Sequence, residues 1–164
     1  MRLFVAARPS AAAVAAIDRL PRPEALGVRW LSTDQWHVTL RFLGEADPDA
    51  AAAAMAGLVA APVEAVAGPA TRLLGDSVLV VPVAGLERLA AAVMAVTAEG
   101  GEPPEDRPFL GHLTLCRFRD EPPSGAVGAA VSATFRVDEV VLVRSRTLPG
   151  GAVHDVLERF QLAA

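Results

Sequence analysis

A four-residue motif occurs twice in this chain and limits its fold more than any other part of the sequence. The copies are residues 37–40 (His-Val-Thr-Leu) and 112–115 (His-Leu-Thr-Leu). Each lies in a segment that alternates apolar and polar residues, which predicts β-strands over 36–42 and 112–118. Successive side chains of a strand point to opposite faces, so each histidine shares a face with the threonine two positions later. One copy falls in each half of the chain.

The rest of the 164 residues alternates between predicted strands and helices. Three helices are expected to begin at Pro9-Ser10, at Asp47-Pro48 and near Leu86, and the second is expected to run to Ala61. No segment resembles an interdomain linker, and no glycine-rich phosphate loop follows a strand. We therefore predict one α+β domain, residues 1–164, made of two similar lobes. Further strands are expected over 2–7, 28–31, 63–67, 78–83, 135–145 and 152–162.

Charge and cysteine content narrow the range of functions. The net charge of -4 argues against a general polyanion binder, because such proteins cluster basic residues to neutralise many phosphates. An RNA ligand would be gripped over a short length. The one cysteine, Cys116, cannot form an internal disulfide, which favours a cytoplasmic location. The most apolar run, 50–63, is too short to span a bilayer, so we expect no membrane contact. We also expect no obligatory protein partner and a monomer.

The paired histidines predict acid–base chemistry. An imidazole titrates near pH 6.5, so one copy can accept a proton while the other donates one. If the strands bring His37 and His112 to opposite sides of a cleft, they can flank a phosphorus atom in an in-line displacement. Thr39 and Thr114 would then donate hydrogen bonds to the phosphate oxygens. The nearest cations in the sequence are Arg41, Arg117 and Arg119.

Other candidate residues carry less weight. A lone histidine or threonine on a strand is ordinarily structural, and only the duplication raises the odds of a site. His154 could complete a three-histidine zinc site, but no nearby ligand spacing indicates one, so we interpret it as structural or peripheral. Alternation puts Cys116 on the histidine face, where it lacks a base and is expected to be a small packed residue. Trp30 and Trp36 are expected in the core.

These residues resemble a known family, the two-histidine phosphoesterases, and in particular the bacterial and archaeal RNA 2',3'-cyclic phosphodiesterases, also described as 2',5' RNA ligases. The similarity extends over 2–6, 37–44, 107–109, 112–117 and 142–151, and so covers essentially the whole chain. The resemblance implies a bilobal fold with pseudo-twofold symmetry, two antiparallel sheets facing a central cleft, and helices on the outside. It also implies that no metal or other cofactor is required.

The resemblance further implies a role for each motif residue. His37 would donate a proton to the leaving oxygen and His112 would accept one from water. The reaction would open a terminal 2',3'-cyclic phosphate to leave a 2'-phosphate, and Arg117 would contact the phosphate. Two positions depart from the family pattern: Gly111 stands where proline is usual, and His154 stands where tyrosine is common.

Arg117 and Phe42 raise a geometric difficulty. Each lies five residues after a motif histidine, so strict alternation places it on the face opposite that histidine. Both can reach the cleft only if their strands bulge, because one extra residue reverses the faces that follow. With such bulges, Phe42 could contact a base and Arg117 the phosphate.

Two alternatives remain open. The same histidines could run the reaction backward as a 2',5' RNA ligase, with an RNA 5'-hydroxyl as the attacking group. The chain could also be a noncatalytic module that binds an RNA end without cleaving it. In each case the expected ligands are RNA 3' ends or small cyclic nucleotides.

Overall fold

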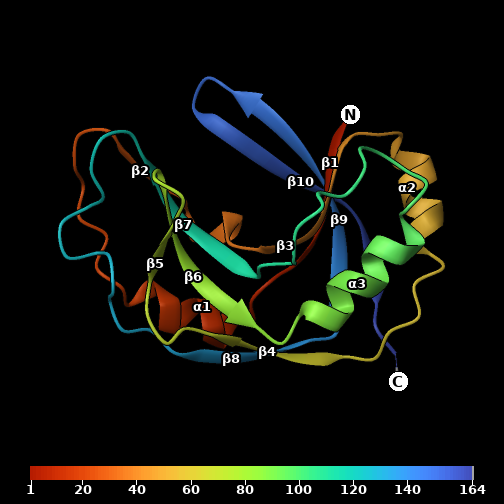
Figure 1. Cartoon of the computed structure of the whole chain (residues 1–164), viewed down its shortest axis with the longest axis horizontal. Helices are drawn as coiled ribbons and strands as arrows, with labels where there is room; N and C mark the ends of the chain where they lie inside the picture. Colours follow the sequence, from red (N-terminus) through yellow and green to blue (C-terminus); the bar gives the residue numbers. More distant parts are fainter. Residues whose placement is uncertain (164) are drawn as a thin grey trace.

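A curled, mostly antiparallel sheet and three short helices form the α+β fold of this chain, as predicted (Figure 1). The computed structural model describes residues 1–163. The helices are α1 (Ala11–Asp18), α2 (Pro48–Met55) and α3 (Glu87–Val96), with a short 3-10 helix η1 (Thr33–Gln35). The strands are β1 (Arg2–Ala7), β2 (Val28–Trp30), β3 (Val38–Glu45), β4 (Val63–Ala67), β5 (Arg72–Leu74), β6 (Val78–Ala84), β7 (His112–Phe118), β8 (Ala133–Val137), β9 (Glu139–Leu148) and β10 (Gly151–Gln161).

Local sequence explains where the first two helices begin and end. Ser10 accepts a hydrogen bond from the backbone of Ala13, and Asp47 does the same for Ala50, so both helices start at side-chain caps. Helix α2 ends at Met55, earlier than predicted. Gly57, two residues later, accounts for the early end, because glycine is a poor helix former. No helix within residues 1–163 has the length and apolar character needed to cross a membrane.

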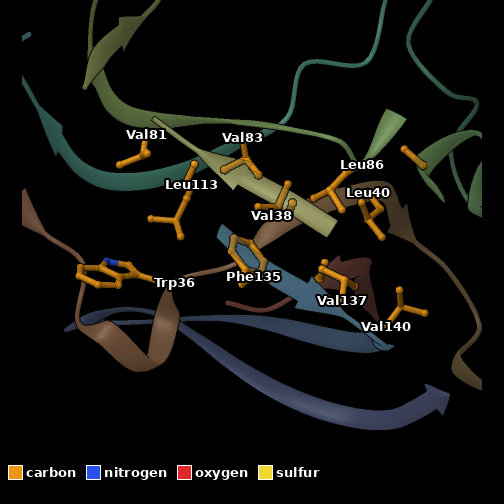
Figure 2. Close-up of a cluster of buried hydrophobic side chains, with 14 of the residues drawn as sticks. Trp36, Val38, Leu40, Val81, Val83, Leu86, Leu113, Phe135, Val137 and Val140 are labelled. Atoms are coloured by element: carbon orange, nitrogen blue, oxygen red, sulfur yellow. The ribbon is translucent and has the colours of Figure 1, made fainter. Parts of the chain in front are cut away.

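The sheet joins its two halves at a single residue pair. The strand order is β10-β9-β1-β3-β7-β6-β4-β8, with β2 beside β7 and β5 beside β6. Strands β3 and β7 meet antiparallel at Val38 and Leu113, which immediately follow the motif histidines. Both side chains are fully buried in the main core, in the cluster with Phe135 that Figure 2 shows. The second residue of each motif thus joins one half of the sheet to the other.

The predicted strand 135–145 is in fact two strands. The chain breaks at Asp138, between β8 and β9. Strand β8 pairs with β4 in one half of the sheet, whereas β9 pairs with β1 and β10 in the other. The apolar pattern hid this corner, because β8 buries alternate side chains and β9 then buries the four consecutive apolar residues 140–143, so apolar residues continue on both sides of Asp138.

Strands β3 and β7 each contain a bulge at the same position of the motif. Ala6 pairs with Thr39 and Val5 with Arg41, so Leu40 has no partner on β1. In β7, Val80 pairs with Thr114 and Leu79 with Cys116, so Leu115 is the unpaired residue. The bulges that would reverse the faces after each motif are therefore confirmed.

Each bulge sends the next residue into the interior. Arg41, expected on the histidine face, is instead only 2% exposed on the core side. Its guanidinium donates to the hydroxyl of Thr97 at 3.3 Å and to the carbonyls of Gly100 and Phe42 at 3.0 and 2.7 Å. These acceptors lie at the C-terminal end of α3 and on β3, where a buried cation finds partial negative charge. Arg41 therefore ties the helix to the strand and is unavailable to the cleft.

We predict that Arg41→Ala lowers the free energy of unfolding by about 2–4 kcal/mol, because it removes a buried side chain together with its three hydrogen bonds to Thr97, Gly100 and Phe42. Arg117→Ala is the matched control, since Arg117 follows the other bulge but is exposed. It should change the free energy by no more than about 0.5 kcal/mol. Urea denaturation of the two variants measures the difference, and equal losses would contradict the role given to Arg41.

Candidate active site

The pairing of β3 with β7 brings both motifs to one place. Val38 pairs with Leu113, and in an antiparallel pair the residues on either side are also opposite each other. His37 therefore lies opposite Thr114, and Thr39 lies opposite His112. Because Val38 and Leu113 point into the core, these four polar side chains lie on the other face of the sheet. All four are half-buried. The structure thus places two imidazoles and two hydroxyls around a single point.

Both imidazoles are oriented in the same way by the backbone. Nδ1 of His37 lies 2.8 Å from the carbonyl oxygen of Gln35, and Nδ1 of His112 lies 2.8 Å from that of Leu110. A carbonyl oxygen only accepts, so in each ring Nδ1 carries the proton and donates it. Nε2 of each ring is left for the cleft. In His37 this nitrogen lies 3.1 Å from Oγ1 of Thr39, whose hydroxyl can donate to it.

His37 is held in an aromatic cluster. Its ring stacks on Phe4, with centroids 4.8 Å apart, and His154 meets both rings edge-on at 5.2 Å. Phe4 belongs to a small apolar patch on the cleft face of the sheet. The other members of this patch are Ala6, Val141, Val143 and Val156. His154, expected to be peripheral, is therefore in contact with the motif histidine.

The cluster makes His37 a weak base. Burial lowers the pKa of His37 to about 4, and the positive charges of His154 and His112 lower it further, against the opposing hydrogen bond to Gln35. Burial also lowers the pKa of His154. At neutral pH His37 is therefore uncharged.

Phe42 and Arg117 share the cleft face with the motifs. Phe42 pairs with Phe4 across β1 and β3, so both lie on the same face, and its ring is 40% exposed. The guanidinium of Arg2 lies 5.0 Å above that ring. In β7, the bulge returns Arg117 to the face of Thr114, where it is exposed. On this face, an aromatic ring thus follows the first motif and a cation follows the second.

Other sequence candidates lie outside this arrangement. Cys116, placed on the histidine face by alternation, is fully buried in the main core because of the β7 bulge, and burial raises the pKa of its thiol to about 11. Arg119 follows the end of β7 and its backbone binds Gly27. Trp36 is buried in the core and Trp30 is half-buried against it. Among residues 1–163, no group of three His, Cys, Asp or Glu side chains is placed to hold a metal ion.

Gly111, the glycine before the second motif, packs against β6. A Cβ at this position would collide with the carbonyl oxygen of Val83, and the Gly111 carbonyl accepts a hydrogen bond from the Val83 amide at 2.9 Å. The glycine thus lets the strand start close beside β6.

Two features of the site were missed in the sequence. Phe4 lies in an apolar run in which nothing distinguishes the residue that stacks on a histidine. The carbonyls of Gln35 and Leu110 are backbone groups, so their residue types give no signal, although each lies two residues before a histidine.

Comparison with known proteins agrees with this architecture. Residues 8–148 match the family model described as the 2'-5' RNA ligase superfamily. The structure of TT0787 from Thermus thermophilus is 30% identical in sequence, with a TM-score of 0.82 over 99% of this chain and 98% of that chain.

More distant structures share the fold. E. coli LigT in complex with 3'-AMP is 24% identical, with a TM-score of 0.78 over 99% of this chain and 98% of that chain. The PDE domain of MHV ns2 is 16% identical, with a TM-score of 0.53 over 96% of this chain and all of that domain. None of the curated proteins compared with the chain matches it.

The packing around His37 predicts its titration. Resonances of the His37 imidazole, followed by NMR, should titrate near pH 4 in the unliganded protein. His154→Gln removes a neighbouring positive charge and exposes the ring, so the pKa should rise. The charge of His112 has a smaller effect on His37 than that of His154, so His112→Gln is expected to raise the pKa of His37 less. A His37 pKa near 6.5 in the wild type would contradict the buried environment described here.

Proposed function

Since this chain belongs to the 2'-5' RNA ligase superfamily, we propose that it hydrolyses the 2',3'-cyclic phosphate at the end of an RNA and leaves a 2'-phosphate. The observation that carries the proposal is the register pair of Val38 and Leu113, which gathers both histidines and both threonines on one face. Members of this superfamily are phosphoesterases and ligases, and the paired imidazoles suit either direction of the reaction.

In the proposed reaction, Nε2 of His112 takes a proton from water as the water oxygen attacks phosphorus. The bond from phosphorus to the 3' oxygen breaks, and the protonated Nε2 of His37 gives its proton to that oxygen. The hydroxyls of Thr39 and Thr114 donate hydrogen bonds to the nonbridging oxygens, and Arg117 supplies the positive charge that the transition state requires. Proton exchange with solvent then restores both rings.

The low pKa of His37 fits this role once a substrate is bound. A proton donor must be charged, whereas burial by itself favours the neutral form of His37. A phosphodiester anion beside the ring favours the protonated imidazole, because an opposite charge within about 4–6 Å raises the pKa of a base. The substrate thus brings about the protonation state that its own cleavage needs.

Phe42 supports a nucleotide as the ligand. An exposed aromatic ring beside a phosphate site offers a surface on which a base can stack. The fold neighbour E. coli LigT has been crystallised with 3'-AMP and with phosphate, which belong to the same class of ligand.

We predict that the protein, in the presence of a chelator, converts an RNA that ends in a 2',3'-cyclic phosphate to a 2'-phosphate product. His37→Ala and His112→Ala should each lower the rate by at least about 100-fold, because each removes a general acid or base. The pH profile of kcat/KM should be bell-shaped, and each variant with measurable activity should lose one limb. Product analysis by chromatography identifies the ester. A 3'-phosphate product would reverse the two roles, and full activity in either variant would contradict the mechanism.

A second candidate is the reverse reaction, which the description of the matching family model favours. An RNA 5'-hydroxyl would replace water as the attacking group, and the product would be a 2',5' linkage. Supplying both RNA halves and measuring joined product tests this function. Hydrolysis without any joined product would reject it.

A further inference from the structure

A second arginine, Arg29, lies directly beside Arg117 on the cleft face. Strand β2 pairs with the C-terminal half of β7, and the register sets Arg29 opposite Arg117, between the pairs Val28–Phe118 and Trp30–Cys116. Directly paired residues of antiparallel strands point to the same face. Because Arg117 shares the face of Thr114, Arg29 does so too.

The two arginines form a like-charged pair without a carboxylate partner. Both side chains are exposed, and neither takes part in an ion pair within residues 1–163. Like charges directly opposite on adjacent strands destabilise a sheet. An anion between or beside the two guanidinium groups would remove that cost, and phosphate oxygens match their planar donor geometry.

Arg29 also touches the β9–β10 hairpin, which belongs to the other half of the sheet. Its guanidinium packs so closely on the turn at Gly151 that a Cβ on that glycine would overlap it. The side-chain amide of Gln35 donates to the carbonyl of Ala152 at 2.9 Å, which fixes the same turn. Figure 1 shows the hairpin projecting beyond the sheet, with its tip leaning toward the side of β2. Arg29 thus lies where the two halves meet again, next to the reactive centre.

Arg29 and Arg117 lie at the same level along β7, beyond the motif residues. Because Arg117, on the motif strand itself, is assigned to the reacting phosphate, Arg29 is left for a neighbouring one. His37 lies at the level of Thr114, whereas Arg29 lies at the level of Arg117, about two strand positions or 6–7 Å further along. This is the scale of one nucleotide step along an extended single strand. We propose that Arg29 binds the phosphodiester that precedes the terminal cyclic phosphate. The inference rests on the proposed function and makes the substrate an RNA chain, preferred over a mononucleoside cyclic phosphate.

The test compares a mononucleoside 2',3'-cyclic phosphate with a trinucleotide that ends in the same group. The wild type should show the higher kcat/KM on the trinucleotide. Arg29→Gln should lower kcat/KM about tenfold more on the trinucleotide than on the mononucleoside, chiefly through KM. The slope of log kcat/KM against log salt concentration for the trinucleotide should become shallower by about one. Arg29→Lys should keep the slope and lose part of the preference, because lysine retains the charge without the planar fork.

Arg88→Gln is the matched control for net charge. Arg88 is exposed on α3 and makes no ion pair within the described residues, so its loss should leave both substrates unaffected. Equal losses on the two substrates in Arg29→Gln would overturn the inference, as would an equal effect of Arg88→Gln. Thermal unfolding should show that Arg29→Gln is at least as stable as the wild type, because it removes a like-charged pair.

A binding measurement separates this inference from the proposed function. If the wild type hydrolyses neither substrate, the proposed hydrolase activity fails, and fluorescence anisotropy with a labelled trinucleotide bearing a terminal 2'-phosphate still tests Arg29. Weaker binding by about tenfold in Arg29→Gln supports the second phosphate contact. Unchanged binding overturns it.

Discussion

The contact between Val38 and Leu113 determines how the polar residues of the two motifs are placed. It is the one residue pair that joins β3 to β7, and therefore one half of the sheet to the other. Its strength comes from complete burial, since each aliphatic side chain contributes about 1.5–3 kcal/mol when removed from water. Because a strand alternates its faces, burying these two residues necessarily presents the flanking histidines and threonines to the opposite side. Stability and placement of the polar groups thus have one cause.

From the sequence, strand alternation predicted this arrangement correctly for the four residues of each motif. It failed at the next position, because Leu40 and Leu115 are bulge residues and an inserted residue has no signature distinct from an ordinary strand leucine. Arg41 and Cys116 were therefore assigned to the wrong face. The fold class, the three helices and most strands followed from periodicity and caps. The corner at Asp138 did not, because pairing partners far apart in the chain decide where a continuous apolar strand breaks.

The two motifs are alike in sequence but differ in electrostatic environment. Both rings donate Nδ1–H to the carbonyl two residues earlier, so their Nε2 atoms are equivalent by backbone geometry. The surroundings break this equivalence: Phe4 and His154 cover His37 and depress its pKa, whereas His112 lies at the start of a strand beside Gly111. Near-symmetric backbones thus hold the two imidazoles in different surroundings, one packed against aromatic rings and the other at the open start of a strand.

The bulges give the two sides of the cleft different chemistry. In β3 the bulge buries a cation and turns Phe42 outward, and the buried Arg41 then binds the Phe42 carbonyl and fixes the backbone that carries the ring. In β7 the corresponding bulge buries Cys116 and turns Arg117 outward. A pseudo-symmetric cleft by itself would accept a substrate in either orientation. For a nucleotide, the ligand of the proposed function, an aromatic surface after one histidine and a cation after the other would remove that ambiguity, because a nucleotide has an apolar base at one end and an anion at the other.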